Sequence, residues 1–160
     1  MRLSIIFVLV MILACQGKKQ DSGKTKTASK ESEAVAEADN IVCSAEVCLQ
    51  LRNHDASNKS FEIYMINAVP VAGFQCDLPG IGISDLDGGL LKENGFEASN
   101  SDSRVLAFSM QGKVISTGMG VLTEISYSVS TNEVCMTEII FAGIGGVQLS
   151  NDTPECLRLN

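Results

Sequence analysis

Val71-Ala-Gly-Phe-Gln-Cys-Asp-Leu78 gives the clearest indication of the fold, because apolar and polar side chains alternate along its second half. Successive side chains of a β-strand point to opposite faces, so this alternation predicts a strand with one face in a core. The segment Asn67-Ala-Val-Pro70 precedes it and separates it from another β-rich stretch, residues 61–67. On the predicted strand the inward residues are Phe74, Cys76 and Leu78, and the outward residues are Gln75 and Asp77.

Short β-rich segments recur along the chain from residue 47 onward, and turn-forming residues such as Asp87-Gly-Gly, Glu93-Asn-Gly and Thr131-Asn separate nearly all of them. No segment in this part shows helical periodicity. Many short strands with turns at this spacing predict an all-β fold, an antiparallel jelly-roll β-sandwich of about nine strands. The predicted strands cover residues 47–51, 61–67, 71–78, 95–99, 104–110, 120–129, 135–142, 147–150 and 156–159.

The N-terminus has the order of a bacterial lipoprotein signal. An apolar run from Ile5 to Leu13 follows the positive start Met1-Arg2. The run is shorter than the roughly 20 residues of a membrane-spanning helix and suits a signal peptide. The tetrapeptide Ile12-Leu-Ala-Cys15 resembles the bacterial lipobox, which implies cleavage before Cys15 and a lipid on that cysteine. We therefore expect a lipoprotein signal peptide at 1–14 and an exported, membrane-anchored protein at the cell envelope or cell surface. An ordinary signal peptide is the alternative.

The chain then divides into a linker and a domain. Residues 15–41 hold the lipidated cysteine and a stretch rich in Gly, Ser, Thr, Gln and Ala without an aromatic residue, which predicts a disordered linker. Residues 42–160 are long enough to bury a core and are expected to form one domain. From residue 41 on, six Lys and Arg stand against fourteen Asp and Glu, a net charge of −8. This acidity excludes nucleic acid as a partner.

Five cysteines remain once Cys15 is assigned to the lipid, and an exported protein forms disulfides. An odd number leaves at least one cysteine unpaired. Because Cys76 alternates with Phe74 and Leu78, we predict that it is the free, buried thiol.

The other four cysteines form two candidate disulfides. Cys135 and Cys156 begin two late predicted strands, whereas Cys43 and Cys48 lie close together where the chain enters the domain. A zinc site is the competing interpretation. It has little support, because His54 is the only histidine and no Cys-x-x-Cys motif is present.

Three segments in order resemble a cohesin domain over roughly residues 46–150. They are Pro70-Val-Ala-Gly-Phe-Gln-Cys-Asp-Leu78, Arg104-Val-Leu-Ala-Phe-Ser-Met110, and Gly118-Met-Gly-Val-Leu122 with Ile125-Ser-Tyr127. Cys76 stands where the family has a large apolar residue, and Ala107 where a glycine is frequent. The resemblance implies a flattened jelly-roll sandwich that binds a dockerin module on one sheet face and has no enzyme activity. Since no duplicated dockerin-like calcium loop is present, this chain would be the receptor.

Alternation along three predicted strands defines the face on which we expect a partner to bind. If Leu106 and Phe108 point into the core, the residues that alternate with them point outward. In the same way, the polar residues that alternate with Ile125 and Tyr127 lie on the face opposite to them. The absence of Trp disfavours a sugar-stacking platform. The function expected is a lipid-anchored module that captures a dockerin-bearing protein. The alternative is a polysaccharide-binding or purely structural envelope lipoprotein. The predicted partner-binding face consists of Gln75, Asp77, Val105, Ala107, Ser109, Glu124, Ser126 and Ser128.

No enzyme or cofactor is expected. His54 lies in a polar loop, where a histidine is usually solvated, and an acid–base pair drawn from Asp85, Asp87 and Glu93 would need a cleft and a raised pKa. Asp85 and Asp87 are a weak candidate for structural calcium through alternate oxygens, but the remaining ligands of an EF-hand loop are absent. A plain turn is the favoured interpretation.

Overall fold

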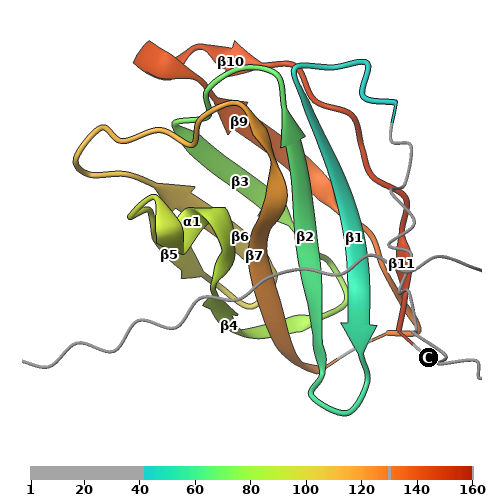
Figure 1. The fold of residues 1–160 in the computed structure, drawn as a ribbon. Coiled ribbons are helices and arrows are strands. Elements are labelled where there is room, and N and C mark those ends of the chain that lie inside the picture. The colour runs from blue at the N-terminus through green and yellow to red at the C-terminus, as the bar shows by residue number, and fades with distance from the viewer. Residues whose placement is uncertain (1–41, 130, 160) are drawn as a thin grey trace, which may run out of the picture. The chain divides into compact units, whose positions relative to one another are not determined.

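The computed structural model describes residues 42–129 and 131–159, which form a sandwich of two antiparallel β-sheets. A four-stranded sheet has the order β1-β2-β7-β4 and a five-stranded sheet the order β10-β9-β3-β6-β5. Figure 1 shows them as two layers, with β1, β2 and β7 in front of β3, β6 and β9. The strands are β1 (Val47–Asp55), β2 (Ser60–Asn67), β3 (Gly73–Asp77), β4 (Gly82–Asp87), β5 (Glu97–Asn100), β6 (Arg104–Phe108), β7 (Gly118–Val129), β8 (Glu133–Val134), β9 (Thr137–Ala142), β10 (Gln148–Leu149) and β11 (Leu157–Arg158).

The predicted all-β sandwich is confirmed, and the strand count was approximate. The described residues hold eleven strands instead of about nine, and three of these have only two residues. The strand β4 was missed, because its sequence Gly-Ile-Ser-Asp-Leu-Asp reads as a polar turn. It nevertheless pairs with β7 through two register shifts. A short helix, α1 (Gly89–Glu93), and a 3₁₀ turn, Ile144–Gly146, also lie outside the all-strand prediction.

The core lies between the sheets and is built by alternation. The inward Phe74 and Cys76 of β3, and Leu78 directly after it, are at most 2 % exposed, as the sequence predicted. Phe74 stacks on Phe141 of β9 with ring centroids 4.9 Å apart, within the range of favourable aromatic pairs. Phe61 and Ile63 of β2 close the core from the other sheet and are fully buried.

The helix α1 carries the chain from the four-stranded sheet to the five-stranded sheet. The turn before it needs two glycines with positive φ, Gly88 and Gly89. A Cβ at Gly89 would lie 2.5 Å from the carbonyl oxygen of Val121, so only glycine fits against β7. This close approach places Leu91 in the core, where it is 2 % exposed.

Both predicted disulfides are present. Cys43 joins Cys48, and Cys135 joins Cys156, while Cys76 is free and buried. The second disulfide ties the chain between β8 and β9 to the C-terminal segment just before β11. The segment assignments at 1–14 and 15–41, with lipidation at Cys15, lie outside the described residues. Among the described residues, no helix is long and apolar enough to cross a membrane.

Removing the disulfides separately is expected to destabilise the domain to different extents. Cys135 and Cys156 are 21 residues apart and Cys43 and Cys48 five, so the first bridge restricts the unfolded chain more. On the chain-entropy relation, Cys135→Ser with Cys156→Ser costs about 3 kcal/mol of unfolding free energy, and Cys43→Ser with Cys48→Ser about 2 kcal/mol. Guanidinium denaturation of the two double variants measures both. Equal losses would contradict the loop-length argument.

The thiol of Cys76 is expected to be unreactive in the folded protein. Burial, and secondarily the charge of Asp77, raise its pKa to about 12, so little thiolate forms at pH 8. Alkylation with iodoacetamide at pH 8, followed by peptide mapping, is expected to leave Cys76 unmodified until the chain is unfolded in guanidinium. Modification of the native protein within minutes would show that the strand opens readily.

Candidate functional site

The outer face of the five-stranded sheet is the candidate site, and β6 makes this face hydrophobic. Along β6 the side chains alternate between exposed and buried, beginning with exposed Arg104. Leu106 and Phe108 are therefore outward, 40 % and 39 % exposed. The register places Leu106 opposite Gln75 of β3, and Gln75 in turn opposite Ile140 of β9. Residues paired in this way share a face of the sheet.

These outward residues form a hydrophobic surface that we call the apolar patch, made of Leu106, Phe108 and Ile140 around Gly73 and Ala142. It encloses a shallow hollow of about 270 Å³, almost without polar atoms. The small residues Gly73 and Ala142 face each other across β3 and β9 and leave the space open. A hollow of this size accepts one or two apolar side chains of a partner.

Charged residues border the apolar patch. Arg104 donates two hydrogen bonds to the carboxylate of Asp77, at 2.5 and 2.7 Å. Its guanidinium lowers the pKa of Asp77, first through these hydrogen bonds and then through its charge. The pKa of Arg104 is raised, first by its hydrogen bonds to Asp77, then by the charge of Asp77, and least by the carboxylate of Glu138. Glu97 of β5 pairs across from Phe108 and is exposed, so carboxylates outnumber cations on this border.

The predicted direction of two β6 residues is wrong. Val105 and Ala107 are fully buried and face the core, whereas their neighbours Leu106 and Phe108 face solvent. The sequence could not decide this, because both sides of the strand are apolar and hydrophobicity alone assigns the larger pair to the interior. Pairing with β3 decides it, since Val105 lies opposite the inward Cys76. Small side chains fit there, between two packed sheets.

The remaining predicted face residues do not form one surface. Gln75 and Asp77 are outward on β3, as predicted. Glu124, Ser126 and Ser128 are on β7, which belongs to the other sheet, so they cannot meet a ligand bound at Gln75. Ser109 follows β6, and its hydroxyl accepts hydrogen bonds from the backbone N–H groups of residues 111 and 113. It therefore shapes the loop after β6.

Sequence reasoning also missed three residues of the site, Leu106, Phe108 and Ile140. The signal that would have found them is a strand that stays apolar on both faces, which is unusual for an antiparallel sheet with one solvated side. Such a strand has one face for the core and leaves a second apolar face exposed to solvent. Residues 104–108 show this pattern.

The outer face of the four-stranded sheet carries the other outward aromatic residue of the sandwich, Tyr64. Its ring is already covered, because the guanidinium of Arg52 lies 3.5 Å from the ring centroid. Arg52 is held there by Glu62, which faces it across β1 and β2. A sugar ring would have to displace this arginine to stack on the tyrosine.

The residues considered for catalysis and calcium lie apart from the apolar patch. Nε2 of His54 is 2.7 Å from the hydroxyl of Tyr127, so the histidine provides a buried tyrosine with a hydrogen-bond partner. Asp87 accepts a hydrogen bond from Lys92, which lowers the pKa of the Asp87 carboxyl, while Asp85 and Glu93 are exposed. A calcium ion at Asp85 and Asp87 would compete with the Lys92 ammonium, and calcium binding there stays a prediction.

Only one cluster of potential metal ligands occurs in the described part of the chain, formed by Glu133, Cys135 and Cys156. Its two cysteines are joined in a disulfide and therefore offer no thiolate.

The site is thus a hydrophobic, acid-bordered face on a jelly-roll β-sandwich, and the fold is that of a cohesin. A non-cellulosomal cohesin from the hyperthermophilic archaeon Archaeoglobus fulgidus matches with a TM-score of 0.51 and 16 % identity, covering 69 % of this chain and 87 % of that one. A chain from a cohesin–dockerin complex matches with a TM-score of 0.47 and 12 % identity, covering 69 % and 95 %. No protein-family model and no curated protein sequence matches this chain. At these identities the likeness concerns the fold.

The ion pair on the border gives a pH-dependent prediction. Because the folded-state pKa of Asp77 is lowered, its stabilising effect is present above the ordinary value of 3.8 and is lost as the pH falls through the lowered value. Asp77→Asn is expected to decrease Tm slightly at neutral pH, by a difference that shrinks and disappears as the pH falls below 3.8 and Asp77 becomes protonated. Thermal melts across this range measure it, and Asp102→Asn, at an exposed carboxylate, is the control. A constant offset at every pH would contradict the role of the ion pair.

Proposed function

We propose that this chain is a non-catalytic binding module, anchored to the cell envelope by a lipid on Cys15, which captures a protein partner on the outer face of its five-stranded sheet. The resemblance to cohesins favours a dockerin-bearing protein as that partner, within a polysaccharide-degrading or surface-assembly system. The apolar patch carries the proposal, since exposed apolar side chains gathered on one face are typical of an interaction site.

The composition of the face supports a protein in preference to a polysaccharide. Its large outward residues are two aliphatic side chains and a phenylalanine around a hollow, an arrangement suited to an inserted apolar side chain. The border of Asp77, Glu97 and Glu138 against Arg104 favours a partner with basic residues around an apolar centre. The tyrosine best placed to stack on a sugar is covered by Arg52.

The proposed docking role predicts that one charge in the apolar patch abolishes capture. Full-length chain immobilised on beads is incubated with an extract of the source cells and with their secreted fraction, and retained proteins are identified by mass spectrometry. Leu106→Asp is expected to weaken binding of a purified retained partner at least tenfold, because a carboxylate would be buried at the centre of the interface. Met119→Asp is the matched control, since Met119 is also exposed but belongs to the four-stranded sheet.

The same experiment separates the alternatives. Stoichiometric capture that weakens with salt and with Leu106→Asp supports docking on this face, and loss in EDTA identifies a calcium-dependent partner. Equal weakening by Leu106→Asp and Met119→Asp would place the interface elsewhere. Retention of the chain by insoluble polysaccharide, without capture of any protein, would replace the proposal by a carbohydrate-binding role.

A further inference from the structure

The outer edge of β1 holds two buried residues, Leu49 and Leu51, whose outward backbone groups have no hydrogen-bond partner among the described residues and are not used by the docking proposal. Val47 donates its N–H to the carbonyl of Ser150 and accepts a hydrogen bond from the N–H of Asp152, in a parallel bridge to the C-terminal segment. Since backbone groups alternate in direction along a strand, the N–H and C=O groups of Leu49 and Leu51 face the same edge. Within the described residues they have no backbone partner there.

A proline rules out one of the hydrogen bonds that would continue this ladder. Continuing the parallel register by two residues would place the N–H of residue 154 on the carbonyl of Leu49. Residue 154 is Pro154, which has no N–H to donate, so this bond cannot form. The bond that comes before it in the register, from the N–H of Leu49 to the carbonyl of Asp152, is also absent among the described residues. The C-terminal segment then pairs with β8 through β11 instead.

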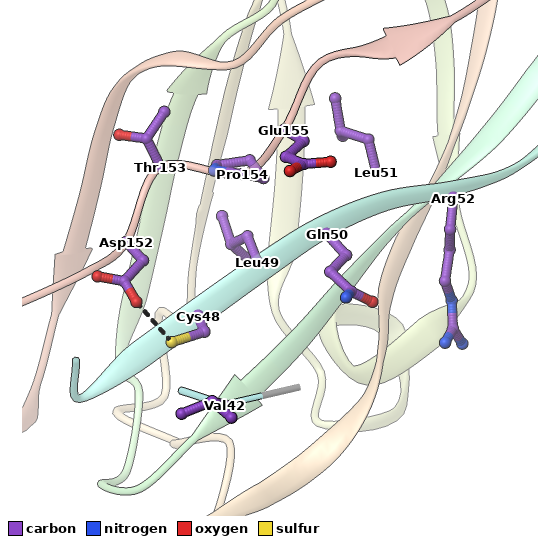
Figure 2. A pocket seen from close by; sticks show the side chains of 10 residues that line it. All are labelled: Val42, Cys48, Leu49, Gln50, Leu51, Arg52, Asp152, Thr153, Pro154 and Glu155. Atoms are coloured by element: carbon purple, nitrogen blue, oxygen red, sulfur yellow. Dashed lines mark hydrogen bonds between the residues drawn. The ribbon is translucent and has the colours of Figure 1, made fainter. Parts of the chain in front are cut away.

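The separation opens a cleft of about 460 Å³ between β1 and residues 152–155. Figure 2 shows Leu49 and Leu51 of β1 directed toward Pro154 and Glu155, while Arg52 points away. One end is closed where Sγ of Cys48 lies 3.3 Å from the carboxylate of Asp152. The cleft therefore has backbone hydrogen-bonding groups along one wall and a second segment of chain along the other.

The charges of the cleft indicate what it would hold. Arg52 is engaged by Glu62 and Tyr64, and the carboxylate of Asp152 accepts a hydrogen bond from Ser44. Glu155 is exposed and has no ion-pair partner within the part of the chain that the structure describes. The free charge of the cleft is thus negative.

We propose that this cleft binds an extended peptide strand with a basic side chain, which adds to the edge of β1 beside Leu49 and Leu51 and places its cation on Glu155. A bare strand edge recognises the main chain of an extended peptide, and a neighbouring charge selects among side chains. The cleft belongs to the four-stranded sheet, so this interaction is separate from docking on the apolar patch.

The test uses the full chain, labelled for NMR, and a six-residue peptide that alternates Val and Thr and carries one Lys. Binding is expected to slow hydrogen exchange of the Leu49 and Leu51 amides, because those groups gain partners. A peptide N-methylated at alternate residues is expected to bind at least about tenfold more weakly, since it lacks the donors that reach β1. Glu155→Gln is expected to weaken binding of the unmodified peptide about threefold, as loss of one exposed ion pair does.

A substitution at the proline tests the cause of the opening. Pro154→Ala supplies the missing N–H in register with Leu49, so it is expected to close the cleft and weaken the peptide at least about tenfold. Pro79→Ala, at an exposed proline outside the cleft, is the control and is expected to bind as the wild type does.

Three results would overturn the proposal. The first is equal binding of the N-methylated and unmodified peptides. The second is protection of the Leu49 and Leu51 amides from hydrogen exchange that is seen in the absence of peptide and increases with protein concentration. It would mean that a second copy of the chain fills the cleft. The third is protection without peptide at every concentration, which would mean that the same chain fills it. Capture of proteins by the apolar patch would be unaffected by any of them.

Discussion

The stacking of Phe74 on Phe141, at the middle of the five-stranded sheet, holds together the parts on which the candidate site depends. β3 pairs with β6 on one side and with β9 on the other, so its inward side chains set the register of both neighbours. With Phe74 and Cys76 buried, Gly73 and Gln75 must face outward. Leu106, Phe108 and Ile140 then meet around them on the solvent side. The alternate side chains of the same strands therefore form the hydrophobic core on one face of the sheet and the apolar patch on the other.

The same constraint explains why the sheet exposes large apolar side chains. Packing between the two sheets leaves room for only small residues on β6, and Val105 and Ala107 occupy it. The larger residues of that strand are consequently on the outside, at a cost that an interaction partner would offset by burying them. Acidic residues on the border keep this face soluble and define the charge of a complementary surface.

Two disulfides and a proline determine how the chain packs beside the edge strand β1. Each disulfide lies near an end of the described part of the chain, one at the entry to β1 and one just before β11. Among the described residues, the C-terminal segment hydrogen-bonds to the backbone of β1 only at Val47, and Pro154 has no N–H to offer to the carbonyl of Leu49. The open edge is therefore short, which limits unspecific strand pairing while leaving two residues available to a peptide.

Alternation and turn residues by themselves determined the all-β sandwich, the inward face of β3 and the buried thiol, because each depends on patterns local to a few residues. The cysteine count and spacing offered both disulfides as candidates, and the structure pairs them. The sequence patterns did not determine which side of β6 faces the core, because both sides are apolar and only pairing with Cys76 and Gln75 chooses between them. Nor did they show that β7 belongs to the other sheet, since strand order depends on contacts between distant segments. Two surfaces thus required the tertiary structure: the apolar patch, built by three strands, and the cleft beside β1, built where residues 152–155 part from it.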